Sequence, residues 1–369
     1  MAKRLSLLMG ISIFMVVLGH AAGWGQVAMF DWAHRYRPVT SPNFDMIGTP
    51  VYYVLAFIRQ AATFPVAAFL FVAGFFSAFS ARSASPAAIW KSVRARIVTL
   101  LIPYTIWSVL VFLYQYILGE RLAPWQYLSL FLTWGATGPY YYIPLLCTLT
   151  LLAPLLVPLA KTRGRFLVTV SILIQLAFLV VRYLKLAYAG TEIAETLYRF
   201  TPDWLFLQWI LFFVLGIVAA FHLEEWKAWT ARHQRLLVVL LPISLAASIL
   251  EADLILRMTH VNLFAIPLLG STMIFALVTI ITCTRFLEVP PALAPGLIKL
   301  AGNSYGIYLL HYTIMEIFAK LTYHYFPGLL ANLWVYIPIL FLLGLGIPLL
   351  VMELIHRTPL RKVNRYLFG

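Results

Sequence analysis

The sequence predicts an all-α fold, a polytopic bundle of about ten transmembrane helices with both termini in the cytoplasm. Of the 369 residues, 62% are hydrophobic and only 11% are charged, whereas a soluble domain carries about 25% charged residues on its hydrated surface. Apolar stretches long enough to cross about 30 Å of hydrocarbon recur along the chain. The positive charges are also divided unevenly between alternate loops. We expect one integral membrane domain over residues 1–369, because no internal repeat or low-complexity linker is visible.

Apolar stretches of roughly 20 residues are the expected spans. They cover 5–22, 50–79, 97–118, 140–160, 166–188, 203–221, 235–251, 261–284, 297–319 and 333–355. Pro65 predicts a kink or a re-entrant start in the second span. The stretch 122–134 is apolar but short, which is typical of an interfacial helix. Lys3 and Arg4 before the first stretch also fit a secretory signal peptide, but we expect this stretch to remain as a span.

The loop charges predict the orientation of these spans. With a cytoplasmic N-terminus, 18 of the 27 Lys and Arg residues fall on the inner side, eight fall on the outer side, and Arg59 lies within a span. Positive residues hold loops in the cytoplasm, so this asymmetry favours ten spans with both termini inside. The net charge of +14 has the same explanation, and we expect no nucleic acid as a partner.

Cysteines and motifs exclude several classes of protein. Cys147 and Cys283 both lie inside apolar runs, so neither a disulfide framework nor a zinc site is expected. The sequence contains no GxGxxG, Walker, HExxH or GxSxG pattern, which argues against P-loop nucleotide hydrolysis and against zinc chemistry. We therefore expect no metal and no permanently bound cofactor.

Ionisable residues inside the predicted spans are the first candidates for function, because each costs about 2.5–3.5 kcal/mol on insertion scales. They are His20, Arg59, His311 and Glu316. His20 lies about 22 Å along its helix from Leu5, at 1.5 Å per residue, and Arg59 and Glu316 also fall in the outer halves of their spans. We expect these groups to share one buried polar pocket. The alternatives are histidines that only pack helices together and a structural Arg59–Glu316 ion pair.

A basic cluster is predicted at the inner side. Arg82 follows the second span, and Lys91, Arg94 and Arg96 come directly before the third. The planar guanidinium suits a phosphate group, and a helix N-terminus adds a positive dipole. The cluster is therefore either a binding site for an anionic ligand or a positive-inside anchor.

The outer loop 23–49 carries Trp24 and Trp32 together with other aromatic and basic residues. Aromatic faces and hydrogen-bond donors of this kind suit a saccharide. An amphipathic interfacial lid is the alternative interpretation.

Five motifs occur in a fixed order along the chain. They are Val16-Val17-Leu18-Gly19-His20, the Phe-rich segment 69–76, Arg94-Ala95-Arg96 with Ile102-Pro103-Tyr104 after it, Gly138-Pro139-Tyr140-Tyr141-Tyr142, and the segment 301–311 with Ser304-Tyr305 and His311. Together they resemble the acyltransferase 3 family of integral membrane O-acyltransferases over about residues 5–355. One position departs from the family pattern: an arginine usually lies eleven residues before the first-span histidine, and this chain has Met9 there.

The resemblance implies transfer of an acyl group from cytoplasmic acyl-CoA, expected to be acetyl-CoA, to a hydroxyl of a cell-surface or lipid-linked saccharide. Acyl-CoA is then a co-substrate, and the lipid bilayer, expected to be a bacterial inner membrane, is the surrounding medium. A neutral imidazole, with an unperturbed pKa of about 6.5, can accept the hydroxyl proton. The roles that follow are His20 as general base with Glu316 or His311 as its orienter, donor binding by Lys91, Arg94, Arg96, Ser304 and Tyr305, and acceptor binding by Arg59, Trp24, Trp32 and Tyr142.

Two other classes of protein fit part of the pattern. A secondary transporter, or a flippase for a lipid-linked sugar or polysaccharide, would also use many spans around a polar midplane. Such folds have interrupted spans in matching positions of two halves, and Pro65 has no such counterpart in the second half. The remaining class is a binding or assembly subunit of a polysaccharide-export complex.

Overall fold

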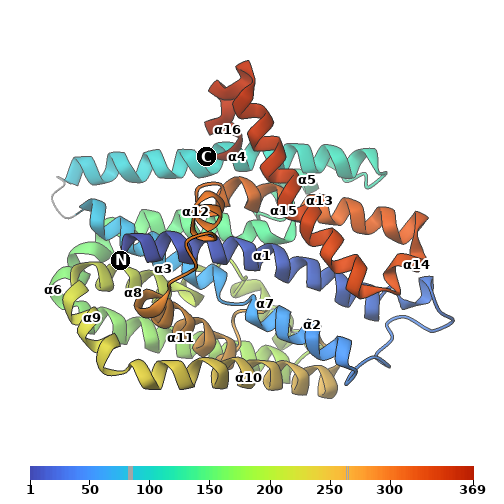
Figure 1. Cartoon of the computed structure of the whole chain (residues 1–369), viewed down its shortest axis with the longest axis horizontal. Helices are drawn as coiled ribbons and strands as arrows, with labels where there is room; N and C mark the ends of the chain where they lie inside the picture. The colour runs from blue at the N-terminus through green and yellow to red at the C-terminus, as the bar shows by residue number, and fades with distance from the viewer. Residues whose placement is uncertain (82–85, 263, 265) are drawn as a thin grey trace.

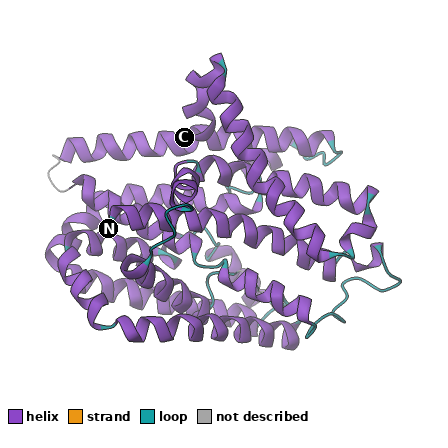
Figure 2. Cartoon of the chain, in the orientation of Figure 1, coloured by secondary structure: helices purple, strands orange, loops and turns teal. Residues whose placement is uncertain are grey.

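The computed structural model describes residues 1–81, 86–262, 264 and 266–369. Helices and the loops between them make up this described part, with no strand in it (Figure 2). Six of its helices are long and apolar enough to cross a membrane, judged by length and composition. The predicted all-α class is therefore confirmed, and the number of spans remains a prediction. Arg82, one of the expected inner charges, lies outside the described residues.

The helices follow one another along the whole chain. In the N-terminal half they are α1 (Ala2–Phe30), η1 (Ala33–Arg35), α2 (Pro50–Ala61), α3 (Pro65–Ala81), α4 (Pro86–Ile117), α5 (Pro124–Leu132), η2 (Gly138–Tyr141) and α6 (Tyr142–Ala187). In the C-terminal half they are α7 (Glu192–Phe200), η3 (Phe206–Gln208), α8 (Ile210–Phe221), α9 (Leu223–Arg232), α10 (Gln234–Thr259), α11 (Gly270–Phe286), α12 (Ala294–Gly302), α13 (Ser304–Tyr325), α14 (Pro327–Leu330), α15 (Leu333–Arg357), η4 (Pro359–Val363) and α16 (Asn364–Phe368).

Several helix boundaries differ from the predicted stretches. The second stretch is broken between α2 and α3, and α3 begins at Pro65, as a proline at a helix start allows. The fourth and fifth stretches form one element, α6, with a kink at Arg163. In the described part of the stretches 203–221 and 261–284, the α-helices begin only at Ile210 and at Gly270, and η3 lies before the first of them. Proline lacks a donor N–H and restricts the residue before it. Pro202 lies directly before the first of these stretches, and Pro267 lies before α11 in the second.

Helices α3 and α8 pack closely against each other through two glycines. Gly74 on α3 faces the carbonyl oxygen of Phe213, and Gly216 on α8 faces the carbonyl oxygen of Phe71. A Cβ atom at either glycine would overlap that oxygen. Two glycines thus let the two backbones approach directly, as small residues do between transmembrane helices.

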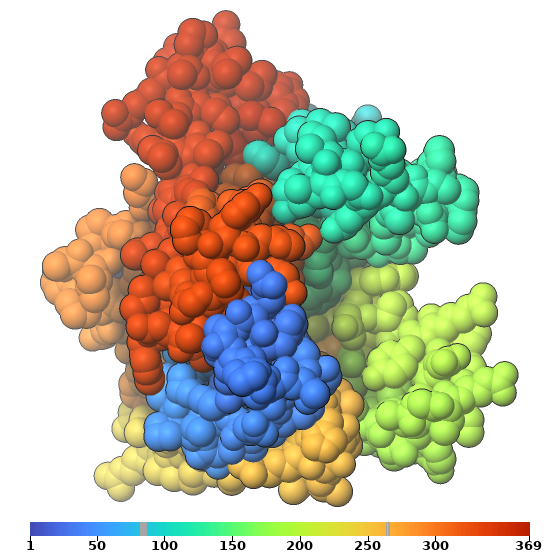
Figure 3. All heavy atoms as spheres, turned by 90° about the vertical axis from the view of Figure 1, so that its right-hand side faces the viewer, coloured from blue at the N-terminus to red at the C-terminus, as the bar shows by residue number. Residues whose placement is uncertain are grey.

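The connections collect at the two ends of the long axis. The N-terminus and α9 lie at one end, and the loop 31–49, α5 and α14 lie at the other (Figure 1). Viewed onto that second end, the loop 31–49 lies centrally, with α5, α7 and the end of α10 around it (Figure 3). The connections predicted to be external are therefore grouped together. Helix α15 runs obliquely to the other long helices, and α16 is attached to α4 by a 2.7 Å hydrogen bond from the Trp107 indole N–H to the Leu367 carbonyl.

Candidate active site

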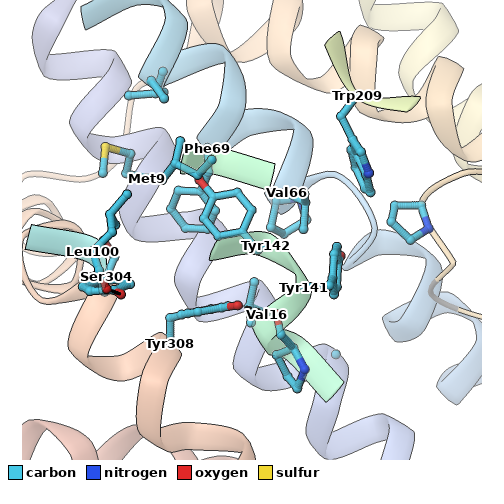
Figure 4. A pocket seen from close by; sticks show the side chains of 18 of the residues that line it. Met9, Val16, Val66, Phe69, Leu100, Tyr141, Tyr142, Trp209, Ser304 and Tyr308 are labelled. Atoms are coloured by element: carbon cyan, nitrogen blue, oxygen red, sulfur yellow. Dashed lines mark hydrogen bonds between the residues drawn. The ribbon is translucent and has the colours of Figure 1, made fainter. Parts of the chain in front are cut away.

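A cavity of about 570 Å³ lies between α1, α3, α4 and α13, with the start of α6 in its wall. Its α1 wall runs from Met9 to His20, eleven residues and hence about 16 Å of helix at 1.5 Å per residue. In Figure 4, Met9, Leu100 and Ser304 lie on one side of the cavity, and Tyr141 and Trp209 lie on the other. The cavity is therefore elongated, and α1 spans much of its length.

His20 lies on the cavity wall with its ring packed against α13. Its ring centroid is 5.3 Å from that of His311 and 5.2 Å from that of Tyr312. No hydrogen bond to His20 occurs in the described part of the chain. The imidazole is therefore held by ring contacts alone, and its nitrogens remain available to a molecule in the cavity.

His311 lies behind His20 and is fully buried. Its Nδ1 is 3.0 Å from the Ile307 carbonyl oxygen and 2.8 Å from the Tyr308 carbonyl oxygen. These two acceptors assign the proton to Nδ1. Nε2 is buried and has no hydrogen-bond partner within the described residues. The structure thus gives His311 a defined tautomer next to the His20 ring.

Arg59 joins α2 to two other segments beside His20. Its Nη1 donates to the Gly19 carbonyl at 3.1 Å, and its Nη2 donates to the Phe264 carbonyl at 2.8 Å. No carboxylate within the described ranges lies within ion-pair distance of it. Arg59 also lines the cavity, so its charge is next to His20 and is not neutralised by an acidic partner.

Glu316 has a different partner from the one considered above. It forms a 2.8 Å ion pair with Lys320, one helical turn further along α13. The predicted alternative of an ion pair between Arg59 and Glu316 is therefore wrong. Glu316 is not among the residues that line the cavity. Five residues separate it from His311, a rotation of about 140° around the helix, which places the two side chains on different faces.

The structure separates the predicted donor-binding residues into two groups. Arg96, Ser304 and Tyr305 line the cavity, and Arg96 Nη1 donates to the Ser77 hydroxyl at 3.2 Å. Arg94 and Lys91 are exposed on α4 and do not line the cavity. Residues two apart on a helix point about 200° apart, so only one arginine of the Arg-x-Arg pair can face inward.

The predicted acceptor-binding residues are also divided. Arg59 and Tyr142 line the cavity, whereas Trp24 and Trp32 do not. The two indoles pack on each other at 5.4 Å between centroids, and Trp32 packs on Tyr323 at 4.9 Å. They form an aromatic cluster between α1 and α13, at the end where the loop 31–49 lies.

Among the lining residues to which the sequence assigned no role are Tyr141, Asp203 and Trp209. Asp203 falls in a stretch that the hydropathy pattern assigns to a span, and the structure places it in the loop before η3. Its carboxylate pairs with Arg182 of α6 at 2.7 Å. An acidic residue directly after Pro202, at the start of an apolar stretch, is the signal that could have identified it.

Candidate metal ligands do not gather at this site. Among the residues that the structure describes, no group of three or more His, Cys, Asp or Glu side chains could hold a metal ion. Cys147 and Cys283 are both free thiols.

Comparison with known proteins identifies the family. A family model described as an acyltransferase domain matches residues 3–353, nearly the whole chain. No curated protein and no solved structure matches the chain. Residues of all five motifs in the family pattern line the cavity, including His20, Phe69, Arg96, Tyr142 and Ser304. The chain therefore belongs to the acyltransferase 3 family of integral membrane acyltransferases.

Proposed function

We propose that this protein transfers an acyl group, acetyl in the simplest case, from cytoplasmic acyl-CoA to a hydroxyl of a cell-surface or lipid-linked saccharide. The observation that supports this most is that one cavity holds both Arg96 and His20. The Arg96 guanidinium, which suits the phosphates of the donor, and the His20 imidazole, which suits the hydroxyl of the acceptor, thus line the same cavity. The bilayer is proposed to be a bacterial inner membrane.

The proposed chemistry is direct acyl transfer with His20 as general base. The acceptor hydroxyl oxygen attacks the carbonyl carbon of the thioester while an unprotonated nitrogen of His20 takes the hydroxyl proton. The tetrahedral adduct then collapses, the C–S bond breaks, and the CoA sulfur leaves with the proton from His20. The ring contact with His311 restricts the orientation of the His20 imidazole, and this makes His311 a positioning residue in the proposal.

Donor binding is proposed at the Arg96 end of the cavity. The Arg96 guanidinium offers charge-assisted hydrogen bonds to a phosphate, and Ser304 and Tyr305 line the same region. Arg94 and Lys91 are exposed on the same helix, within two turns of Arg96, where they add positive potential beside this end of the cavity. The flexible arm of acyl-CoA would then extend along α1 toward His20.

Acceptor binding is proposed at the His20 end. Arg59 is fixed by two carbonyl groups and carries a charge without an acidic partner in the described segments. It can donate to an oxygen of the acceptor. Tyr142, on the wall between the two ends, offers a further hydroxyl.

The test is acceptor-dependent thioester cleavage by the purified protein in lipid nanodiscs. Labelled acetyl-CoA and a panel of saccharides are supplied, and both free CoA and labelled saccharide are measured. We expect the two products in equal amounts. Movement of an unmodified saccharide in sealed vesicles, with no CoA released, would instead support a transporter or flippase.

A further inference from the structure

The loop 201–209 at the cavity wall is fixed to α6 and to itself by several side-chain hydrogen bonds. Lys185 Nζ donates to the Thr201 carbonyl at 2.9 Å, and Gln175 Nε2 donates to the Gln208 carbonyl at 2.6 Å. Within the loop, the Gln208 amide and the Trp209 indole donate to the Pro202 and Asp203 carbonyls at 2.7 and 2.9 Å. The loop backbone is therefore held rigidly, as a preformed binding site requires.

Asp203 is presented to the cavity by this loop. Its Oδ1 accepts a 2.7 Å hydrogen bond from Arg182, whose side chain is only 8% exposed, whereas the Asp203 side chain is 62% exposed. Its Oδ2 has no hydrogen-bond partner in the described part of the chain. Arg182 therefore orients the carboxylate of this cavity-lining residue and leaves its second oxygen unpaired.

An aromatic wall lies beside this carboxylate. The rings of Tyr141 and Trp209 are nearly parallel, with centroids 6.3 Å apart and an interplanar angle of 28°. Both residues line the cavity, and they lie on the same side of it (Figure 4). A mostly apolar wall with one well-placed polar group is the usual composition of a small-molecule site.

We propose that Asp203, Tyr141 and Trp209 form the acceptor subsite and select an uncharged sugar ring. The carboxylate accepts hydrogen bonds from ring hydroxyls, and the half-buried Tyr141 packs on the C–H face of the ring. Trp209, which is only 1% exposed, supports the Tyr141 ring. An ionised carboxylate only accepts hydrogen bonds and repels other anions. At Asp203 a uronic acid should thus bind less well than a neutral hexose, whereas the Arg59 charge on the same cavity acts in the opposite sense. The Asp203→Asn variant therefore isolates the contribution of the carboxylate. A simple aliphatic alcohol would leave the aromatic wall and the second oxygen unused.

This inference rests on the proposed function, and its test uses the same nanodisc assay. The acceptors are methyl glucoside, galactoside and mannoside, methyl glucuronide, and 1-octanol, each with acetyl-CoA. Asp203→Asn keeps an oxygen for Arg182 and removes the charge. Glu195→Gln on α7 is the matched control, because it makes the same charge change outside the cavity lining.

We expect at least one neutral hexoside to stimulate CoA release and to be preferred over the glucuronide. Asp203→Asn should raise the KM for the hexoside at least about tenfold, the loss expected for one charge-assisted hydrogen bond. It should also reduce the preference over the glucuronide and leave the KM for acetyl-CoA unchanged. Trp209→Phe, which keeps a ring and loses the N–H bond to Asp203, should raise the hexoside KM by a smaller factor. Glu195→Gln should match the wild type.

Three outcomes would overturn the inference. An unchanged hexoside KM in Asp203→Asn would remove Asp203 from acceptor binding while leaving the acyltransferase intact. Stimulation by 1-octanol or the glucuronide, with none by any hexoside, would assign another acceptor class to the same enzyme. No CoA release with any acceptor, combined with flux of an unmodified hexoside, would refute the proposed function and this inference with it.

Discussion

The imidazole of His20 has ring neighbours and no hydrogen-bond partner in the described structure, which is suitable for a base that must bind a substrate proton. We predict that His20→Ala lowers kcat by about 10²–10⁴-fold, the usual contribution of a general base. The thermal unfolding temperature should change little, because no hydrogen bond is lost. The measurement is CoA release at saturating donor and acceptor, with His356→Ala, exposed on α15, as the control histidine. Turnover near the wild-type rate in folded His20→Ala would exclude His20 as the base.

The two arginines of the Arg-x-Arg motif should differ in effect, because only Arg96 lines the cavity. We predict that Arg96→Ala raises the KM for acyl-CoA by roughly tenfold or more, as expected for one lost charge-assisted hydrogen bond. Arg94→Ala should have a much smaller effect, since its side chain is exposed. Arg96→Lys should recover only part of the affinity, because the planar fork is lost.

Steady-state kinetics with varied donor and fixed acceptor provides this comparison. The acceptor KM serves as the internal control and should remain constant in both arginine variants. Equal losses for Arg94→Ala and Arg96→Ala would indicate that only the total positive charge matters, as in a positive-inside anchor.

At the scale of helices, the α3–α8 contact depends on two glycines whose Cα atoms face backbone carbonyls. We predict that Gly74→Ala and Gly216→Ala each destabilise the protein, by about 1–3 kcal/mol as is typical of overpacking. The obstructing atoms are backbone oxygens, which cannot move aside as a flexible side chain can. Thermal unfolding in detergent measures the effect.

Gly346 on α15 is the matched control for these substitutions, because no atom lies within 4 Å of a Cβ built there. Gly346→Ala should leave stability unchanged or raise it slightly, since alanine favours helix more than glycine does. If all three variants unfolded at the wild-type temperature, α3 and α8 could separate without cost, and the close packing would not support the cavity.

At the scale of the whole molecule, donor and acceptor are proposed to enter the cavity from opposite sides of the bilayer. We predict that sealed proteoliposomes given labelled acyl-CoA outside form labelled saccharide only when the acceptor is inside. Molecules inserted in either orientation can be present, because only those with Arg96 toward the outside medium reach the donor. The measurement is labelled saccharide after separation of the vesicles from the medium.

Permeabilised vesicles are the control for this experiment, and they should form product with the acceptor in either compartment. Product formed in sealed vesicles with both substrates outside would preserve the acyltransferase and contradict the cross-membrane geometry. It would mean that the cavity admits donor and acceptor from the same end.

The sequence by itself determined the class of this protein, and it singled out several residues that line the cavity. Hydropathy and charge are local properties, and 62% hydrophobic residues with 11% charged residues require a membrane-embedded helical chain. Pro65 marks the break in the second stretch because a proline restricts the backbone wherever it occurs. The motif residues His20 and Arg96 lie on the cavity wall, and the motif order identifies the family.

Only the tertiary structure decided which polar side chains contact one another and which of them line the cavity. Glu316 pairs with Lys320 and not with Arg59, and Arg94 points away from the cavity that Arg96 lines. Asp203 became a candidate only because Arg182, 21 residues earlier, holds its carboxylate at the cavity wall. Hydropathy describes how each segment partitions between water and lipid, whereas these contacts depend on helix rotation and on packing between segments that are distant along the chain.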